Sequence, residues 1–164
     1  MKVSFTGHRP NKLGGYQNNP ISDYVKEKLT EKIEKCILDG VDNFISGMAI
    51  GVDTWAAEIV LQLKEKYSHI KLEAAIPFKG QEGKWPDFSQ DIYNNILKKC
   101  DKITIVCEGT YAAWKMQKRN EYMVDNSDLV IAVWDGTTGG TKNCIKYARS
   151  QSKKVIWINP NDKE

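Results

Sequence analysis

Two glycine-rich segments of the sequence each stand directly before a stretch with helical spacing. Gly47 and Gly51 precede one such stretch, and Gly139 and Gly140 precede another. Glycine lets a backbone approach an anion closely, and the first turn of a helix offers free N–H groups. Neither segment has the spacing of a dinucleotide GxGxxG motif or a P-loop. The two segments predict a phosphate or pyrophosphate site, although glycine is also common where a strand simply turns into a helix.

Arginine side chains are candidates for binding such an anion. A guanidinium can hold a phosphate or carboxylate through two parallel hydrogen bonds, which makes Arg9 and Arg119 the preferred contacts. Arg119 could instead pair with Glu121 or Asp125 on a solvated helix face. The spacing of these residues leaves both interpretations open.

Acidic, imidazole and aromatic side chains near the glycines could hold the rest of a nucleotide. Asp53 and Asp135 could bind ribose hydroxyls, but Asp53 could equally cap a helix. His8 could act as a base, as an anion donor or as a cap, and the sequence identifies no partner for it. Three aromatic residues could stack on a base or pack in the core: Phe78, Trp85 and Trp134.

Short apolar runs alternate with longer stretches of helical spacing, the pattern of βαβ units and a parallel sheet. The predicted strands are residues 3–6, 43–46, 71–76, 102–107, 129–134 and 155–159. The predicted fold class is therefore α/β, a Rossmann-like three-layer sandwich with a mainly parallel sheet of about six strands. In such sheets ligands bind at the carboxyl ends of the strands, where the glycine-rich segments begin.

Five stretches of helical spacing separate these strands. The first begins near Pro20 and ends before Gly40, and the second begins at Asp53 or Thr54. The third has apolar residues at intervals of four, which predicts one buried face: Phe88, Ile92, Ile96 and Cys100. The fourth begins near Ala112, and the fifth follows the second glycine pair.

Length and charge limit the functions that the chain can perform. Its 164 residues match one domain, which we expect to span residues 1–164. The net charge is only +3 and the lysines are dispersed, so we do not expect a nucleic-acid-binding stripe. No apolar run approaches the roughly 20 residues that span a bilayer, and the N-terminus has no signal-peptide pattern. We therefore expect a cytoplasmic protein with no membrane partner.

The four cysteines do not predict a metal site. Cys36, Cys100, Cys107 and Cys144 lie far apart, without a CxxC pair, and the sequence has only two histidines. We expect no metal site and no required cofactor. Free cysteines in a reducing compartment are most often small buried hydrophobes.

Four segments of the chain together resemble the YpsA-like branch of the SLOG superfamily, which groups the DNA-processing protein DprA with the LOG phosphoribohydrolases. The segments are Thr6-Gly7-His8-Arg9-Pro10, Ser46-Gly47-Met48-Ala49-Ile50-Gly51-Val52-Asp53, Arg119-Asn120 leading to Ser127-Asp128, and Trp134-Asp135-Gly136 with Gly139-Gly140-Thr141. The resemblance implies one SLOG-like, Rossmann-like domain that binds nucleotides or nucleotide-derived molecules such as ADP-ribose, NAD fragments or a signalling nucleotide.

The residues and the resemblance together define a predicted ligand-binding set at the carboxyl edge of the sheet. Its members are Thr6, Gly7, His8, Arg9, Ser46, Gly47, Met48, Ala49, Gly51, Asp53, Pro77, Phe78, Arg119, Asp135, Gly136, Gly139, Gly140 and Thr141. No catalytic residue is assigned within this set.

Departures from the LOG pattern argue against LOG-type hydrolysis. LOG enzymes carry a Met-His-x-Arg-Lys segment, whereas residues 116–120 here keep the Met and the Arg but lack the His and the final Lys. The position of the LOG catalytic glutamate is taken by Cys144. We therefore expect a sensor or sequestering protein that binds its ligand without turnover. The alternative is a nucleoside-phosphate N-glycosidase or a related nucleotide hydrolase.

The expected partner is a nucleotide-derived small molecule, and self-association into a homo-oligomer is compatible with the exposed aromatic residues. DprA-like proteins bind single-stranded DNA, but their SLOG domain is usually accompanied by further modules. Because this chain has dispersed lysines and no room for such modules, we do not expect single-stranded nucleic acid as a partner.

Overall fold

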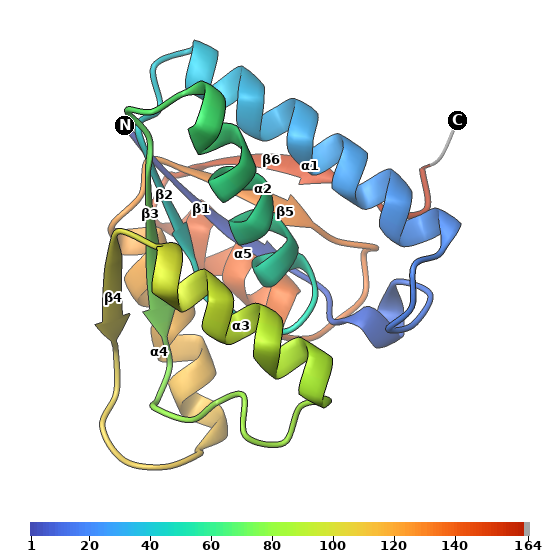
Figure 1. Ribbon diagram of the computed structural model, residues 1–164, viewed down its shortest axis with the longest axis vertical. Coiled ribbons are helices and arrows are strands. Elements are labelled where there is room, and N and C mark those ends of the chain that lie inside the picture. The colour runs from blue at the N-terminus through green and yellow to red at the C-terminus, as the bar shows by residue number, and fades with distance from the viewer. Residues whose placement is uncertain (163–164) are drawn as a thin grey trace.

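A computed structural model describes residues 1–162, and within them six strands form one parallel sheet (Figure 1). The strands are β1 (Lys2–Gly7), β2 (Asn43–Ser46), β3 (Lys71–Ile76), β4 (Lys102–Ile105), β5 (Leu129–Val133) and β6 (Lys154–Ile158). Their order across the sheet is β4-β3-β2-β1-β5-β6, and every neighbouring pair is parallel. The predicted α/β Rossmann-like fold is confirmed.

Helices cover both faces of the sheet in the described residues. They are α1 (Pro20–Leu38), α2 (Val52–Lys66), α3 (Asp87–Lys99), α4 (Ala113–Asp125) and α5 (Gly140–Ser150), with a short 3-10 helix at Pro10–Lys12. Helices α1, α2 and α3 pack side by side on one face, and α4 and α5 pack together on the other (Figure 1). None of the helices in residues 1–162 combines the length and apolar character needed to cross a membrane.

The central strands are buried on both faces because helices cover them from both sides. Along β5, Ile131 and Val133 belong to the apolar cluster under α1, α2 and α3, whereas Val130 packs with Val124 and Cys144 on the opposite face. The alternation of side chains along a strand therefore supplies both halves of the core. Of the other cysteines, Cys36 is buried, but Cys100 and Cys107 are only half-buried.

Two details of the helices differ from the sequence prediction. Helix α2 begins at Val52 after Gly51, so Asp53 lies inside the first turn and does not cap it. In α3 the buried residues are Ser89, Tyr93 and Ile96, and Phe88 is 53% exposed. Residues at strict intervals of four drift around a helix of 3.6 residues per turn, so an unbroken run of fours leaves the buried face.

The order in which strands are added to the sheet changes sides between β1 and β5. Strands β2, β3 and β4 follow on one side of β1, and β5 and β6 lie on the other. At such a switch point the loops after the two central strands diverge and leave a crevice at the carboxyl edge. The first turns of α2 and α5 follow the loops that border this crevice.

Candidate functional site

A cavity of about 290 Å³, here called the Arg119 pocket, lies at the carboxyl edge beside β1. Nine residues of the predicted set line it: Thr6, Gly7, His8, Arg9, Ala49, Asp53, Arg119, Gly140 and Thr141. Four lining residues were not predicted: Asn11, Lys12, Met116 and Asn120. The structure thus brings together residues from β1, the loop before α2, α4 and the start of α5.

Arg119 lies inside the protein and not on a solvated helix face. Its side chain is only 5% exposed, its Nη1 donates to the carbonyl of Gly47, and its Nε donates to Asn120 Oδ1 at 2.9 Å. A Cβ atom at Gly47 would lie 2.8 Å from Arg119 Cδ, so only glycine leaves room for the guanidinium. The alternative pairing with Glu121 or Asp125 is therefore wrong.

Asp53 supplies a buried carboxylate to the same pocket. Its side chain is almost fully buried, and Oδ2 accepts a hydrogen bond from the Ala49 N–H at 3.3 Å. Its other oxygen, Oδ1, has no hydrogen-bond partner among residues 1–162. Burial raises the pKa of Asp53 to about 6, against the opposing charge of Arg119. A buried acceptor without a partner is costly, which makes Oδ1 a natural contact for a ligand donor.

His8 joins the end of β1 to the end of β5 through Asp135. His8 Nε2 lies 2.9 Å from Asp135 Oδ1 and 3.0 Å from the Asp135 backbone nitrogen, and Nδ1 lies 3.5 Å from Thr141 Oγ1. Burial lowers the pKa of His8, which favours the neutral ring. A carboxylate oxygen only accepts, so in the neutral ring Nε2 carries the proton and donates it to Asp135 Oδ1, and Nδ1 faces the Thr141 hydroxyl as an acceptor.

Asp135 remains ionised beside this histidine. Burial by itself would raise the pKa of Asp135, but hydrogen bonds from Thr137 and the proximity of His8 outweigh it and lower the pKa to about 2. The Thr137 backbone N–H and hydroxyl both donate to Oδ1, and the Lys12 ammonium donates to Thr137 Oγ1 at 2.9 Å. Asp135 therefore organises the loop beside the pocket without lining it.

The first turn of α5 contributes free backbone donors to the pocket. The earliest hydrogen bond of this helix runs from the Asn143 N–H to the Gly139 carbonyl, so the preceding N–H groups have no partner within the helix. Gly140 and Thr141, which belong to this turn, line the pocket. Exposed Arg9 and Lys12 add positive charge at its mouth. The arrangement can hold an anion and, at Asp53, a hydroxyl donor.

Other predicted residues shape the loops around the pocket. Ser46 Oγ donates to the carbonyl of Asp53 at 2.8 Å and accepts the Met48 N–H at 3.1 Å. Gly51 has a φ of 104°, and a Cβ atom there would lie 2.8 Å from the His8 carbonyl oxygen. Five more predicted residues do not line the pocket: Pro77, Phe78, Gly136, Gly139 and, as described, Asp135.

The aromatic candidates do not enter the Arg119 pocket. Trp134 packs against Trp157, with ring centroids 5.8 Å apart, and its indole N–H donates to the Thr137 carbonyl. Trp85 packs edge-on against buried Tyr93, and Phe78 packs edge-on against Tyr111. A base bound in the Arg119 pocket itself would have none of these rings beside it.

Some of the residues that were missed had a signal in the sequence. Met116, Arg119 and Asn120 stand at intervals of three and four, which places them on one face of a helix. Once Arg119 is assigned to the site, its two helical neighbours follow. Asn11 and Lys12 directly follow the Arg9-Pro10 pair, but nothing in their residue types separates them from an ordinary polar loop.

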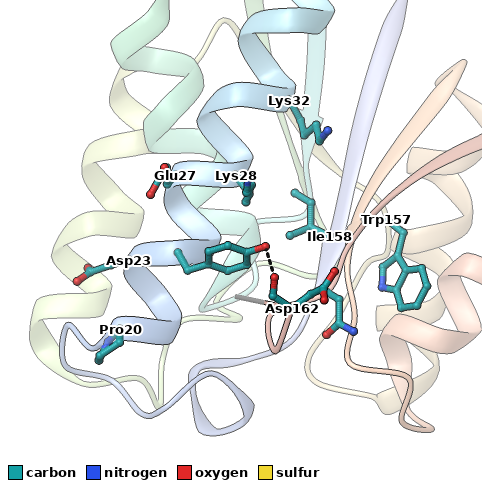
Figure 2. A pocket seen from close by; sticks show the side chains of 10 residues that line it. Pro20, Asp23, Glu27, Lys28, Lys32, Trp157, Ile158 and Asp162 are labelled. Atoms are coloured by element: carbon teal, nitrogen blue, oxygen red, sulfur yellow. Dashed lines mark hydrogen bonds between the residues drawn. The ribbon is translucent and has the colours of Figure 1, made fainter. Parts of the chain in front are cut away.

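A separate hollow of about 790 Å³ lies between α1 and the end of β6 (Figure 2). Its walls carry acidic and basic side chains, and the Tyr24 hydroxyl donates to the Asp162 carbonyl at 2.8 Å (Figure 2). No residue of the predicted ligand-binding set lines it. Within the described residues, no three His, Cys, Asp or Glu side chains form a cluster suited to a metal ion.

The chain matches one protein family and is similar to bacterial proteins over most of its length. Residues 3–161 match the model of the family named YpsA, described as the YspA SLOG family. The chain is 39% identical over 143 residues to the SPbeta prophage-derived protein YoqJ of Bacillus subtilis, covering 80% of this chain and 84% of that protein. It is 31% identical over 168 residues to a UPF0398 protein of Brevibacillus brevis, covering 98% and 89% respectively.

Two solved structures share the fold at low sequence identity. DNA processing protein A (DprA) from Streptococcus pneumoniae superposes with a TM-score of 0.65 and 18% identity, covering 96% of this chain and 50% of that chain. DprA from Helicobacter pylori superposes with a TM-score of 0.71 and 20% identity, covering 100% and 67%. This chain thus spans about half of the Streptococcus protein.

The Helicobacter pylori structure corrects one expectation. It is described as showing a unique single-stranded DNA binding mode. Excluding single-stranded nucleic acid on the basis of dispersed charge and chain length was therefore wrong, because a protein with this fold binds it.

Proposed function

Because this chain belongs to the YspA SLOG family, we propose that it binds a nucleotide or nucleotide-derived small molecule in the Arg119 pocket. The observation that carries the proposal is that Arg119, with a buried guanidinium, and Asp53, with an Oδ1 that lacks a hydrogen-bond partner, line the same cavity. Buried groups of this kind are expected to have partners, and a ligand would supply them. The proposed role is that of a sensor or of a protein that sequesters the ligand.

The two ends of the pocket suit different parts of a nucleotide. The phosphate is assigned to the side formed by Arg119 and the first turn of α5, where charge and free N–H groups coincide. A ribose hydroxyl is assigned to Asp53 Oδ1, which accepts its hydrogen bond. Arg119 and Asp53 form no ion pair within 4.0 Å in the described structure, so the Asp53 carboxylate does not take up the guanidinium donors.

The chemistry of Cys144 supports binding without LOG-type turnover. Its thiol is buried, does not line the pocket, and has a pKa raised to about 11 by burial. It therefore supplies neither a carboxylate nor a thiolate to the ligand.

Hydrolysis of the ligand is the second candidate function, and one observation favours it. The pKa of Asp53, about 6, lies close to the range in which a carboxyl group exchanges protons efficiently near neutral pH. In an N-glycosidase, Asp53 would position or deprotonate the attacking water.

Calorimetric titration of the purified protein with AMP, ADP-ribose and NAD tests both candidates. Each mixture is then separated by chromatography, so that the recovered ligand can be compared with the material added. Saturable binding of at least one ligand recovered intact supports a sensor or sequestering role. Products that accumulate in proportion to protein, and disappear with Asp53→Asn, would assign the hydrolase instead. Absence of binding by the whole panel would contradict the proposal.

A further inference from the structure

A second cavity, of about 980 Å³, adjoins the Arg119 pocket and is here called the aromatic compartment. Arg9 and Met116 line both cavities, so the two cavities are direct neighbours along the carboxyl edge. The compartment is formed by the loop between β3 and α3 and by the loop between β4 and α4. It is more than three times as large as the Arg119 pocket, so one phosphate and one ribose leave most of the combined space empty.

Aromatic side chains in the compartment are held in place by their neighbours. The Phe78 and Tyr111 rings pack edge to face with centroids 5.9 Å apart, and Lys115 Nζ lies 5.9 Å from the Phe78 centroid. Trp85 packs edge to face against buried Tyr93 at 5.3 Å. Tyr111 is 68% exposed, so one face of the pair remains open to a ligand. Rings held in this way stack on a base with little loss of side-chain entropy.

A buried lysine fixes the loop that carries Tyr111. Lys115 is almost fully buried, and its ammonium donates to the carbonyls of Glu108 and Thr110. These bonds tie the segment between β4 and α4 to the first turn of α4. The wall of the compartment is therefore formed before any ligand arrives.

Positive charge also extends into the compartment. Arg9 stands at the junction of the two cavities, and Lys79 and Lys84 line the compartment as exposed side chains. Among residues 1–162, no carboxylate side chain lines this compartment. Cations alternating with aromatic rings form a surface that suits a phosphate backbone carrying bases.

We propose that the ligand contains two nucleosides joined by phosphate, with one phosphate and ribose in the Arg119 pocket and the second nucleoside in the aromatic compartment. This inference rests on the proposed function and specifies the class of ligand. The two-nucleoside chemistry is shared by a free dinucleotide and by a short single-stranded oligonucleotide, and the experiment distinguishes these sources.

The test compares four probes by calorimetric titration: AMP, NAD, the linear dinucleotide pApA and a single-stranded hexamer of deoxyadenosine. The wild-type protein is compared with Tyr111→Ala, which removes an exposed ring, and with Trp114→Ala as a matched control. Trp114 is also exposed, at 59%, and lines neither cavity. Thermal melting of each variant verifies that the fold is retained.

We expect a two-nucleoside probe to bind about tenfold or more tightly than AMP, because stacking of a second base strengthens binding. Tyr111→Ala should remove most of this difference and leave the affinity for AMP unchanged, whereas Trp114→Ala should change neither. Preference for NAD or pApA over the hexamer identifies a free dinucleotide, and the reverse identifies a nucleic-acid strand.

Three outcomes would overturn the inference, and they can be told apart. Equal affinity for AMP and for every two-nucleoside probe would reject the second nucleoside site and leave the Arg119 pocket as a mononucleotide site. Absence of binding by all four probes would reject the proposed function itself. A dinucleotide preference that survives Tyr111→Ala unchanged would also reject the aromatic compartment as its source.

Discussion

The guanidinium of Arg119 lies directly against the backbone of Gly47, although the two residues are 72 positions apart in the chain. The Nη1 atom donates to the Gly47 carbonyl, and the absence of a side chain at Gly47 leaves the space that the guanidinium occupies. A loop that follows β2 and a helix that follows β4 thus meet beside the Arg119 pocket, the proposed anion site. Glycine is needed here for close approach to a side chain, and not for turning the chain.

Substitution of Gly47 should disturb the site through Arg119. In Gly47→Ala the new Cβ would lie 2.8 Å from Arg119 Cδ, so the guanidinium must move. We expect about a tenfold to hundredfold loss of affinity for a phosphate-containing ligand, the range for one lost charge-assisted hydrogen-bonding group. Titration calorimetry on Gly47→Ala, Arg119→Met and the double variant measures this. A double variant that loses as much as the two single losses added together would show that Gly47 acts independently of Arg119.

Gly140 offers a way to block the pocket without disturbing the core. A Cβ atom at this position would meet no protein atom within 4 Å, yet Gly140 lines the Arg119 pocket. We expect Gly140→Val to fold normally, with a melting temperature within a few degrees of wild type, and to lose at least about tenfold in affinity. Asn143→Val is the control, because Asn143 is an exposed residue in the same turn of α5 and lies outside the pocket. Equal binding by Gly140→Val and wild type would remove the start of α5 from the site.

The raised pKa of Asp53 predicts an unusual pH dependence of stability. Burial raises this pKa from 3.8 to about 6, so the folded protein retains the proton over a range where the unfolded chain has lost it. The stabilisation is complete below about pH 4 and is lost as the pH rises through about 6. Asp53→Asn should therefore flatten the pH profile of the unfolding free energy by about 2 kcal/mol between pH 4 and 7.

Urea denaturation at several pH values measures this difference. Asp91→Asn, which changes an exposed aspartate on α3, serves as the control and should keep the wild-type profile. If the stabilities of Asp53→Asn and of wild type change with pH in parallel, Asp53 titrates normally in the folded protein. That result would contradict the raised pKa of Asp53.

The environment of His8 predicts that its ring is neutral at pH 7. Burial lowers the pKa of His8 below 6.5, and Asp135 partly opposes this effect. Removing the negative charge with Asp135→Asn should therefore lower the pKa of His8 further. Nuclear magnetic resonance of the imidazole nitrogens follows the titration of His8 in the wild type and in the variant. A rise in the pKa of His8 in the variant would contradict the assigned geometry.

The lowered pKa of His8 also affects stability, in the opposite direction to Asp53. Because the unfolded chain takes up this proton first, the contribution of His8 to stability decreases as the pH falls below about 6.5. His8→Gln should reduce this acid sensitivity in urea denaturation. An unchanged slope between pH 5 and 6.5 would show that the ring is solvated in the folded state.

The sequence alone predicted the fold class and the edge of the sheet that carries the pocket. Alternating apolar runs and helical stretches encode local periodicity, and the ends of strands β2 and β3 matched the structure residue for residue. Right-handed parallel crossovers then place the loops after β1, β2 and β5 at one edge. Gly47, Asp53 and Gly140 could therefore be predicted near one another before any contact was known.

Only the tertiary structure decided which side chains meet and in what electrostatic state. Helical spacing predicts which face of α4 carries Arg119. Whether that face is buried depends on the sheet it packs against and on the space left by Gly47. Likewise, His8 and Asp135 are separated by 127 residues and become partners only because β1 and β5 are adjacent at the switch point. The pKa of Asp53 follows from complete desolvation beside Arg119, and desolvation is a property of the packed protein that local sequence does not encode.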